Sequence, residues 1–360
     1  MVTQLIASSL IAILLIIAGP ARADGERNHM AETANPYLHL HATDPVNWRP
    51  WNAETLAEAK KFGKPILLSI GYLSCHWCHV MQRESYAIEA TAKLINDNFL
   101  PILVDREEMP ELDATFQSAA ALMGLGGGWP LTMFLTPGGK PFYGGTYFPP
   151  QETGGMVSFT YVLGQVIETY RLKPDALVEN ATAIAEELAN RSLSMPGNVT
   201  MVQIDQTAAV FLTDVNAFSG GFGDAPLFPM TVAQELLWRA YIRSGDDNYR
   251  DAVTRTLDAM VRGGIYDHLG GGFFRYTVDP AWNVPHFEKM LDVNANMVRL
   301  MTEVWRETRS TLLARAIEDT VAFMAREMRL SGGGSRPPWM PTVFSRPAAK
   351  NKRGRFICGT

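Results

Sequence analysis

Two cysteines separated by two residues carry the strongest chemical signal in this chain. The motif Cys75-His76-Trp77-Cys78 follows a short apolar run from Lys64 to Tyr72 and precedes helix-compatible sequence that continues to about Asn98. A thiolate at the start of a helix is stabilised by unpaired backbone N–H groups and by the helix dipole, so its pKa falls. A second thiol one turn later can resolve a mixed disulfide. We therefore expect Cys75 to be the exposed nucleophile and Cys78 the more buried resolving thiol.

A proline later in the chain is expected to lie next to the two cysteines. Pro130 follows a glycine-rich turn and opens the apolar run from Leu131 to Leu135, which we expect to be a strand. The cis form is energetically accessible to an X-Pro bond and rarely to any other. The sequence is therefore consistent with a cis proline at position 130 whose neighbouring backbone lies beside the two sulfurs.

Three other uses of the cysteine motif stay open. With His79 the motif also reads Cys-x-x-Cys-His, the signature of covalent haem attachment. The same five residues hold four zinc donors, although four ligands so close together would strain a tetrahedral site. A plain structural disulfide is the third alternative. The strand that precedes the motif favours redox chemistry over all three, and we expect no cofactor and no metal.

A second cluster of chemically able side chains lies in a glycine-rich loop from 263 to 287 and just beyond it. Two histidines and two carboxylates stand out there, namely Asp267, His268, His286 and Glu288. Such groups at a helix–helix connection can serve as general acids and bases. The alternative is that they tie down a long loop by hydrogen bonds and ion pairs, as buried polar groups commonly do.

Composition sets the limits on class and partners. The chain has 360 residues, a net charge of −5 and 47% hydrophobic residues, which suits two soluble globular domains. Nucleic-acid binding is not expected because it requires a basic surface. Three cysteines do not make a disulfide framework.

The N-terminus predicts export. The run from Leu5 to Ala18 is almost wholly apolar and is followed by Ala21-Arg22-Ala23, a small-x-small cleavage signal. We interpret residues 1–23 as a signal peptide and expect a periplasmic or secreted protein. An uncleaved N-terminal anchor is the alternative, because Met1 to Gln4 contains no Lys or Arg, and it would be the chain's only membrane contact.

Periodicity divides the remainder into an α/β part and a helical part. Strands are predicted at 64–72, 100–104 and 131–135, with helices between them and a hairpin turn at 137–140. From Val157 the pattern is helical, and Leu193 to Thr200 is the best linker. The predicted helices span 157–170, 174–191, 205–218, 230–243, 247–262, 289–307 and 311–328.

Several ordered blocks together carry a family resemblance. They include Asn35-Pro36-Tyr37-Leu38, the Cys75 to Met81 turn, Gly127-Gly128-Trp129-Pro130-Leu131, Gly263 to Phe273 and Val284 to Leu291. In these blocks the chain resembles the thioredoxin-like family of spermatogenesis-associated proteins, from residue 35 to about 334. The resemblance implies a thioredoxin-like domain followed by an (α/α) toroid of the six-hairpin glycosidase type. It also implies that Cys75, Cys78 and Pro130 form a redox centre and that Asp267, His268, His286 and Glu288 belong to a loop site of the toroid.

Two functions follow as hypotheses. One is thiol–disulfide exchange with protein thiols or disulfides as partners. The other is carbohydrate binding or sugar modification, with the thioredoxin-like domain as an interaction module. The chain departs from the family at Leu227, where a lysine is usual, and at Asp292-Val293-Asn294-Ala295, which displaces a carboxylate. The resemblance therefore supports redox chemistry more strongly than sugar chemistry.

We divide the chain into five parts: signal peptide 1–23, thioredoxin-like domain 30–170, helical connection and linker 171–204, partial helical domain 205–334 and tail 335–360. After Gly334 the sequence turns basic and rich in proline, without helical periodicity. Codons for Trp339-Met340-Pro341, read one base earlier, permit an acidic stretch of the kind that the family has there. We therefore expect a disordered, frameshifted tail, a C-terminally truncated toroid and no redox role for Cys358.

Overall fold

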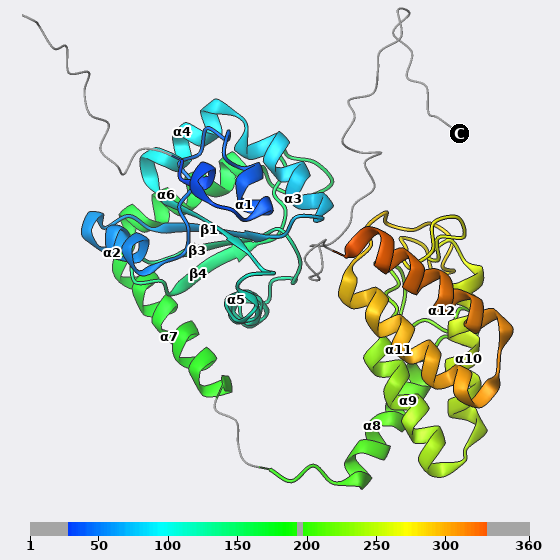
Figure 1. Ribbon diagram of the computed structural model, residues 1–360. Coiled ribbons are helices and arrows are strands. Elements are labelled where there is room, and N and C mark those ends of the chain that lie inside the picture. The colour runs from blue at the N-terminus through cyan, green and yellow to red at the C-terminus, as the bar shows by residue number, and fades with distance from the viewer. Residues whose placement is uncertain (1–27, 193–196, 330–360) are drawn as a thin grey trace, which may run out of the picture.

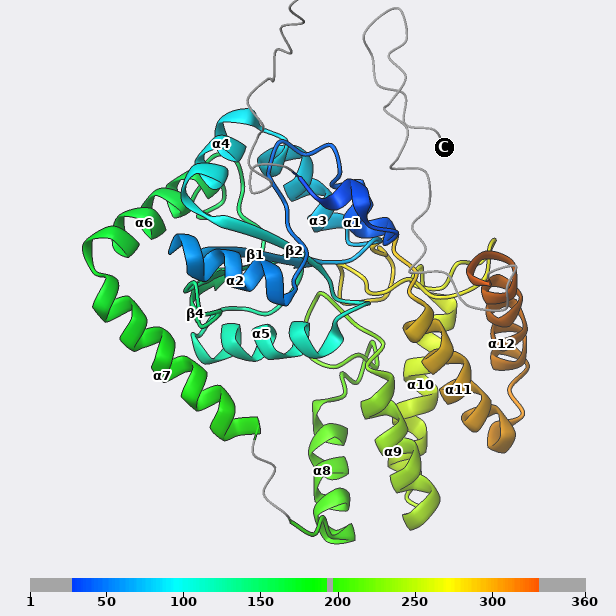
Figure 2. The same cartoon turned by 60° about the vertical axis from the view of Figure 1, so that its left-hand side comes forward.

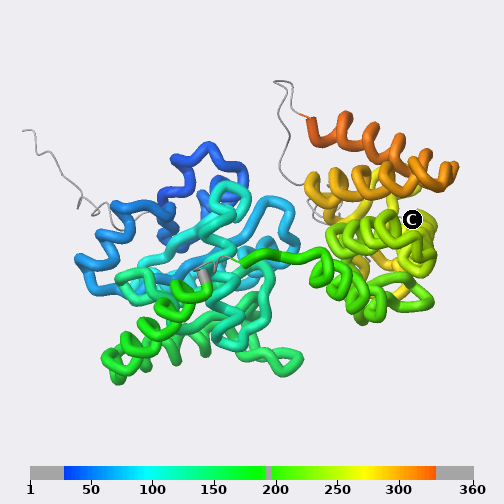
Figure 3. The backbone as a smooth tube through the Cα atoms, turned by 90° about the horizontal axis from the view of Figure 1, so that it is seen from below, coloured from blue at the N-terminus to red at the C-terminus, as the bar shows by residue number. Residues whose placement is uncertain are grey.

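The computed structural model describes residues 28–192 and 197–329. An α/β domain comes first in the chain, and the helices from α8 onward form a separate group (Figures 1 and 3). This arrangement confirms the predicted fold class, a thioredoxin-like domain followed by an all-α domain. The predicted signal peptide and the predicted frameshifted tail lie outside the described residues.

A four-stranded mixed sheet forms the centre of the first domain. Its strands are β1 (Ile66–Gly71), β2 (Leu100–Asp105), β3 (Leu131–Leu135) and β4 (Pro141–Gly145), in the order β2-β1-β3-β4. Strands β1 and β2 are parallel, whereas β3 is antiparallel to both β1 and β4. The hairpin turn between β3 and β4 is closed by Thr136 N, which donates to Lys140 O at 2.9 Å. The three strands and the hairpin turn predicted from the sequence are confirmed.

Both faces of the sheet are covered, which explains why β1 and β2 read as continuous apolar runs rather than alternating ones. Leu67 packs in a cluster with residues of α1, α3, α4 and α6, while its neighbours Ile66 and Leu68 pack against α2 and α5 on the other face. The helices of this domain are α1 (Pro36–Leu40), α2 (Ala53–Phe62), α3 (His76–Met81), α4 (Glu89–Asn98), α5 (Pro110–Leu122), α6 (Phe159–Leu172) and α7 (Pro174–Ser192), with a short turn η2 (Met30–Glu32) before them. Helix α7 packs on α5, α6 and β4, so the helical connection lies against the first domain.

The helix-compatible sequence that follows the cysteines does not form one continuous helix. Helix α3 passes into a π-helical turn, η3 (Gln82–Tyr86), before α4 begins. Tyr86 is buried and its ring meets Trp48 at a centroid distance of 4.9 Å, while Ile88 takes an extended backbone conformation. The helix-compatible sequence to about Asn98 thus folds as two α-helices joined by a π-helical turn, at whose end Tyr86 is anchored in the core.

The second domain is built of paired helices. They are α8 (Met201–Asp214), α9 (Thr231–Ser244), α10 (Asp247–Arg262), α11 (Leu291–Thr308) and α12 (Thr311–Phe323), followed by a π-helical turn η4 (Met324–Met328). Helix α9 contacts α11, and α10 contacts α12, so alternate helices form two rows, as in a segment of an (α/α) toroid (Figure 2). Helix α8 begins four residues earlier than predicted because Thr200 and Gln203 form a capping box.

Within residues 28–192 and 197–329, no helix combines the length and apolar character that crossing a bilayer requires. The long loop between α10 and α11, yellow in Figure 2, runs along the side of the helical domain that meets α3. Several contacts described below join this loop to the first domain. The first domain therefore has an apolar cluster on each face of its sheet and the second domain has one. Met290 of the second domain packs into the cluster that contains Cys75, beside the polar contacts that join the domains.

Candidate functional site

The two cysteines lie where the sheet topology brings three segments together. Cys75 is the N-cap of α3, four residues after the end of β1. Because β1 pairs in parallel with β2, Arg106 emerges at the same edge of the sheet, next to Gly71. Strand β3 is antiparallel to β1 and begins at this edge, which places Pro130 there too. Trp129-Pro130 is a cis peptide bond, as the sequence suggested.

Cys75 and Cys78 are joined by a disulfide with an S–S distance of 2.08 Å. The backbone N–H of Cys78 donates to Cys75 Sγ at 3.1 Å, so the first turn of α3 directs a hydrogen-bond donor at this sulfur. His79 is held elsewhere, with Nε2 2.7 Å from the carbonyl of Leu73. Both thiols are thus in the disulfide, and one ring nitrogen of His79 is held within the turn.

The expected difference in exposure between the two cysteines is wrong for this disulfide form. Cys75 is 2% exposed and Cys78 is 3% exposed. The reason is that residues of the second domain contact both sides of the Cys75 turn, and no local sequence pattern predicts these contacts. Trp77, between the cysteines, is 45% exposed and remains at the surface.

Glu288 of the second domain lies directly behind the cysteine turn. Its Oε1 accepts a hydrogen bond of 2.9 Å from Ser74 Oγ, and Ser74 is the residue that precedes Cys75. The Glu288 side chain is 1% exposed, and burial raises its pKa against the opposing effects of Arg275 and of hydrogen bonds from Tyr72 and Ser74. A carboxyl group from one domain is thus buried beside the cysteine turn of the other.

Arg275 binds the same turn from the same loop. Its guanidinium donates to the hydroxyl of Tyr72 and lies 3.4 Å from Glu288 Oε2. It also lies over the rings of Tyr72 and Trp129, at 5.5 and 5.3 Å from their centroids. Arg106 of the first domain approaches these two rings as well, at 5.4 and 4.2 Å. Two aromatic rings next to the disulfide are therefore in contact with two cations.

His286 meets the residue that follows Cys75. Its ring centroid is 5.4 Å from that of His76, and its ring stacks on Tyr276 at 4.6 Å. Burial, with His76 and Arg275 nearby, lowers the pKa of His286 to about 4. The Nδ1 atom is buried without a hydrogen bond, 3.7 Å from Glu288 Oε2. His286 is therefore neutral at pH 7, with one ring nitrogen turned toward the buried carboxyl group.

A cavity of about 310 Å³ opens beside this histidine pair. Neutral, mostly aromatic and apolar side chains from both domains line it: His76, Trp77, Tyr276, Val278, Pro285, His286 and Phe287. It adjoins the two residues that separate the cysteines. A small group that approaches the disulfide can be held here.

The other two loop candidates lie apart from the cysteines. Asp267 forms an ion pair of 2.7 Å with the buried Lys289 and accepts hydrogen bonds from Leu269 N and Gly270 N. His268 places Nε2 3.0 Å from the carbonyl of Gly263. These contacts stay within the loop and its flanking residues. The structure thus divides the four loop residues, with His286 and Glu288 at the disulfide and Asp267 and His268 fastening the loop.

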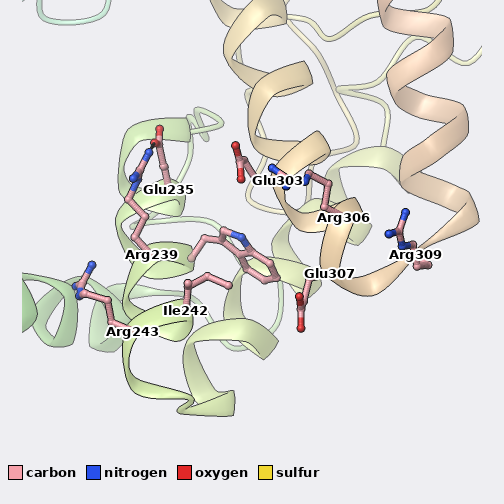
Figure 4. Close-up of a pocket in the computed structure, with 9 residues that line it drawn as sticks. Glu235, Arg239, Ile242, Arg243, Glu303, Arg306, Glu307 and Arg309 are labelled. Atoms are coloured by element: carbon pink, nitrogen blue, oxygen red, sulfur yellow. Dashed lines mark hydrogen bonds and ion pairs between the residues drawn. The ribbon is translucent and has the colours of Figure 1, made fainter.

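A larger cavity of about 640 Å³ lies between α9 and α11, within the second domain (Figure 4). Arginines and glutamates surround it, including Arg239, Arg306 and Glu303. Arg239 is engaged by Glu235 at 2.6 Å. None of the loop candidates lines this cavity.

Sequence reasoning missed three residues of the site, namely Tyr72, Ser74 and Arg106. It assigned Arg275 and Glu288 to the loop of the helical domain and did not place them at the disulfide. Tyr72 and Ser74 come just before the cysteine motif, and Arg106 follows a predicted strand. Their positions could therefore have been inferred from the order and direction of the predicted strands. The contacts of Arg275 and Glu288 join residues about 200 positions apart in the chain, and no local pattern announces them.

Fold and site together define a thioredoxin-like protein in which a helical domain packs against the disulfide. Residues 27–189 match a family model described as thioredoxin DsbH, a protein of unknown function, DUF255. Spermatogenesis-associated protein 20 of Mus musculus is 36% identical over 319 residues, which is 85% of this chain and 40% of that protein. An uncharacterized protein of Caenorhabditis elegans is 35% identical over 313 residues, covering 85% of this chain and 43% of that protein. Residues 27–189 thus carry the thioredoxin-like family match, and the chain is related in sequence to spermatogenesis-associated protein 20 over 85% of its length.

The chain spans less than half the length of these relatives. Among solved structures, it is similar to cellobiose 2-epimerase from Spirochaeta thermophila, with 19% identity, a TM-score of 0.34 and coverage of 39% of this chain and 40% of that chain. It is also similar to DsbH oxidoreductase, with 23% identity, a TM-score of 0.28 and coverage of 36% of this chain and 86% of that chain.

Proposed function

We propose that this protein exchanges thiols and disulfides through Cys75 and Cys78. The observation that carries the proposal is the hydrogen bond from Cys78 N to Cys75 Sγ at the first turn of α3. On reduction the same donor, with the helix N-terminus, stabilises a thiolate at Cys75 and makes it the better nucleophile. Cys78, one turn further on, then resolves the mixed disulfide.

The neutral cavity beside His76 and His286 supports a particular class of substrate. It is lined by aromatic and apolar side chains and by no Lys, Arg, Asp or Glu, so it suits a cysteine with an apolar neighbour in a peptide. A thiol that carries several charges gains no ion pair there. Protein thiols or disulfides are therefore the proposed substrates.

A trapping experiment tests the assignment of the two cysteines. Reduced Cys78→Ser protein should attack oxidised glutathione, form a disulfide between Cys75 and one glutathione, and release the other as a thiolate. Cys75→Ser should form no such adduct in the same time. Both variants should also carry Cys358→Ser, because a third cysteine would otherwise react. Intact mass measures the adduct, and equal adduct formation in the two variants would contradict the assignment.

The contacts favour the carbohydrate alternative less. Of the residues that the family resemblance assigns to sugar chemistry, Asp267 is bound by Lys289 and His268 contacts Gly263, while His286 and Glu288 face the disulfide. They do not gather around a single cavity of the described helical domain. Thiol–disulfide exchange accounts for the positions of more of these side chains.

We also infer that the protein is exported, on the apolar run from Leu5 to Ala18 and the Ala21-Arg22-Ala23 signal. Export would deliver the cysteine pair to an oxidising compartment, where disulfides persist. N-terminal sequencing of the mature protein should begin near Asp24. An intact Met1 would instead support the membrane-anchor alternative.

A further inference from the structure

The turn that leads into Cys75 is held at both ends by the second domain. Arg275 binds the hydroxyl of Tyr72, and Glu288 accepts from Ser74 Oγ at 2.9 Å. Tyr72 and Ser74 are buried, and the backbone N–H of Cys75 donates to Tyr72 O at 3.1 Å. The loop between α10 and α11 therefore contacts the residues that position the nucleophilic sulfur.

These two contacts bring opposite charges close to Cys75 in surroundings with little water. The Glu288 side chain is 1% exposed and that of Arg275 is 18% exposed. Other polar groups that interact with them are Tyr72, Ser74 and Glu107 of the first domain and Tyr276 and His286 of the loop. His76 contacts His286, and Arg106 shares the rings of Tyr72 and Trp129 with Arg275. Partial burial weakens solvent screening, so each charge affects a neighbouring thiolate more than a surface charge would.

We propose that Glu288 and Arg275 are positioning residues of the redox centre, and that their charges set how readily the Cys75–Cys78 disulfide is reduced. This inference rests on the proposed function. It assigns to the helical domain a role in the chemistry of the thioredoxin-like domain. The carboxylate disfavours a thiolate at Cys75, whereas the guanidinium favours it.

The signs follow from electrostatics. Removing the negative charge stabilises the Cys75 thiolate, which lowers the thiol pKa and stabilises the reduced protein. Removing the positive charge does the opposite. For a charge within about 10 Å at an effective dielectric constant of about 20, the thiol pKa changes by about 1, equivalent to about a tenfold change in the reduction equilibrium.

The test uses the full chain carrying Cys358→Ser in defined mixtures of reduced and oxidised glutathione. In the measured equilibrium, two glutathione thiols supply two electrons and two protons. They reduce Cys75–Cys78 to two thiols and leave as one glutathione disulfide. The mixtures are held at a pH above the pKa of Cys75, where this thiol releases its proton to the buffer and the charge effect on the thiolate enters the equilibrium. The fraction of reduced protein gives the equilibrium constant, and thiolate absorbance against pH gives the pKa of Cys75.

Glu288→Gln keeps a hydrogen-bond acceptor for Ser74 but removes the charge. It should shift the equilibrium about tenfold toward the dithiol and lower the Cys75 pKa. Arg275→Gln should shift both quantities in the opposite direction, and Arg275→Lys, which keeps the charge, should stay near the wild type. Glu307→Gln, on the exposed side of α11, is the matched control for loss of a carboxylate and should leave both quantities unchanged.

The opposite signs distinguish charge from mere loosening of the junction. If Glu288→Gln and Arg275→Gln move the equilibrium in the same direction, the two residues act by packing and the proposal is overturned. If a Glu288 variant does not fold, Arg275→Gln and Arg275→Lys still separate charge from packing. A wild-type protein that does not equilibrate with glutathione contradicts the proposed function, whereas unchanged equilibria in the variants contradict this inference alone.

Discussion

Gly71 shows how closely the chain packs around Cys78. It is the last residue of β1, and a Cβ added there would lie 2.8 Å from Cys78 Sγ and would also overlap the hydroxyl of Tyr37. Both neighbours are buried side chains of the same apolar cluster. The absence of a side chain at position 71 therefore allows the sulfur and the tyrosine to approach the strand.

Gly71→Ala should lower the free energy of unfolding by about 1–3 kcal/mol, because an extra methyl group in a packed core forces side chains or backbone to move. Urea denaturation of the oxidised protein measures the change. Gly164→Ala in α6 is the matched control, since nothing lies within 4 Å of its added Cβ and a helix favours alanine by up to about 1 kcal/mol. An unaffected Gly71→Ala protein would show that the site relaxes without cost.

At the scale of elements, local sequence was sufficient for the sheet and for most helices. The apolar run at 131–135 matches β3, and the helix predicted at 247–262 matches α10, which Asp246 caps through the backbone N–H of Asn248. These features depend on nearest neighbours along the chain. Buried strands with two covered faces and amphipathic helices leave a periodic signature that a single sequence retains.

The long loop between α10 and α11 could not be placed in this way. Its contacts with the first domain join side chains such as Glu288 and Ser74, which no periodicity connects. The sequence therefore indicated two separate sites, one of cysteines and one of loop residues. Two of the four loop residues, His286 and Glu288, lie at the cysteine site. Tertiary packing decides which polar groups of an irregular segment meet, and the sequence carries no periodic pattern for it.

Considered as a whole, the molecule joins the apolar clusters of its two domains through a junction that contains many polar and ionisable groups. At this junction His286 lies against His76, and its Nδ1 lies 3.7 Å from Glu288 Oε2. The stability of the contacts at this junction should therefore depend on pH more strongly than that of the apolar clusters. The response of His286 can be worked out from its pKa, because burial lowers it from an ordinary value of 6.5 to about 4.

A histidine with a depressed pKa contributes stability above its unfolded pKa, and this contribution is lost as pH falls toward the folded value. For His286 the window runs from about pH 6.5 down to about pH 4. Between pH 7 and pH 5 the loss should amount to at most about 2 kcal/mol. Burial raises the pKa of Glu288, which acts in the opposite direction over part of this range.

Comparison with His286→Gln isolates the histidine from Glu288 and from all other titrating groups. Urea denaturation at pH 7 and pH 5 should show a smaller loss of stability in His286→Gln than in the wild type. His39→Gln, an exposed histidine on α1, is the control and should lose as much as the wild type. If the wild type and His286→Gln lose the same amount, His286 accepts a proton in the folded protein at little cost. In that case the carboxylate of Glu288, whose Oε2 lies 3.7 Å from His286 Nδ1, pairs with the protonated ring and offsets the cost of its burial.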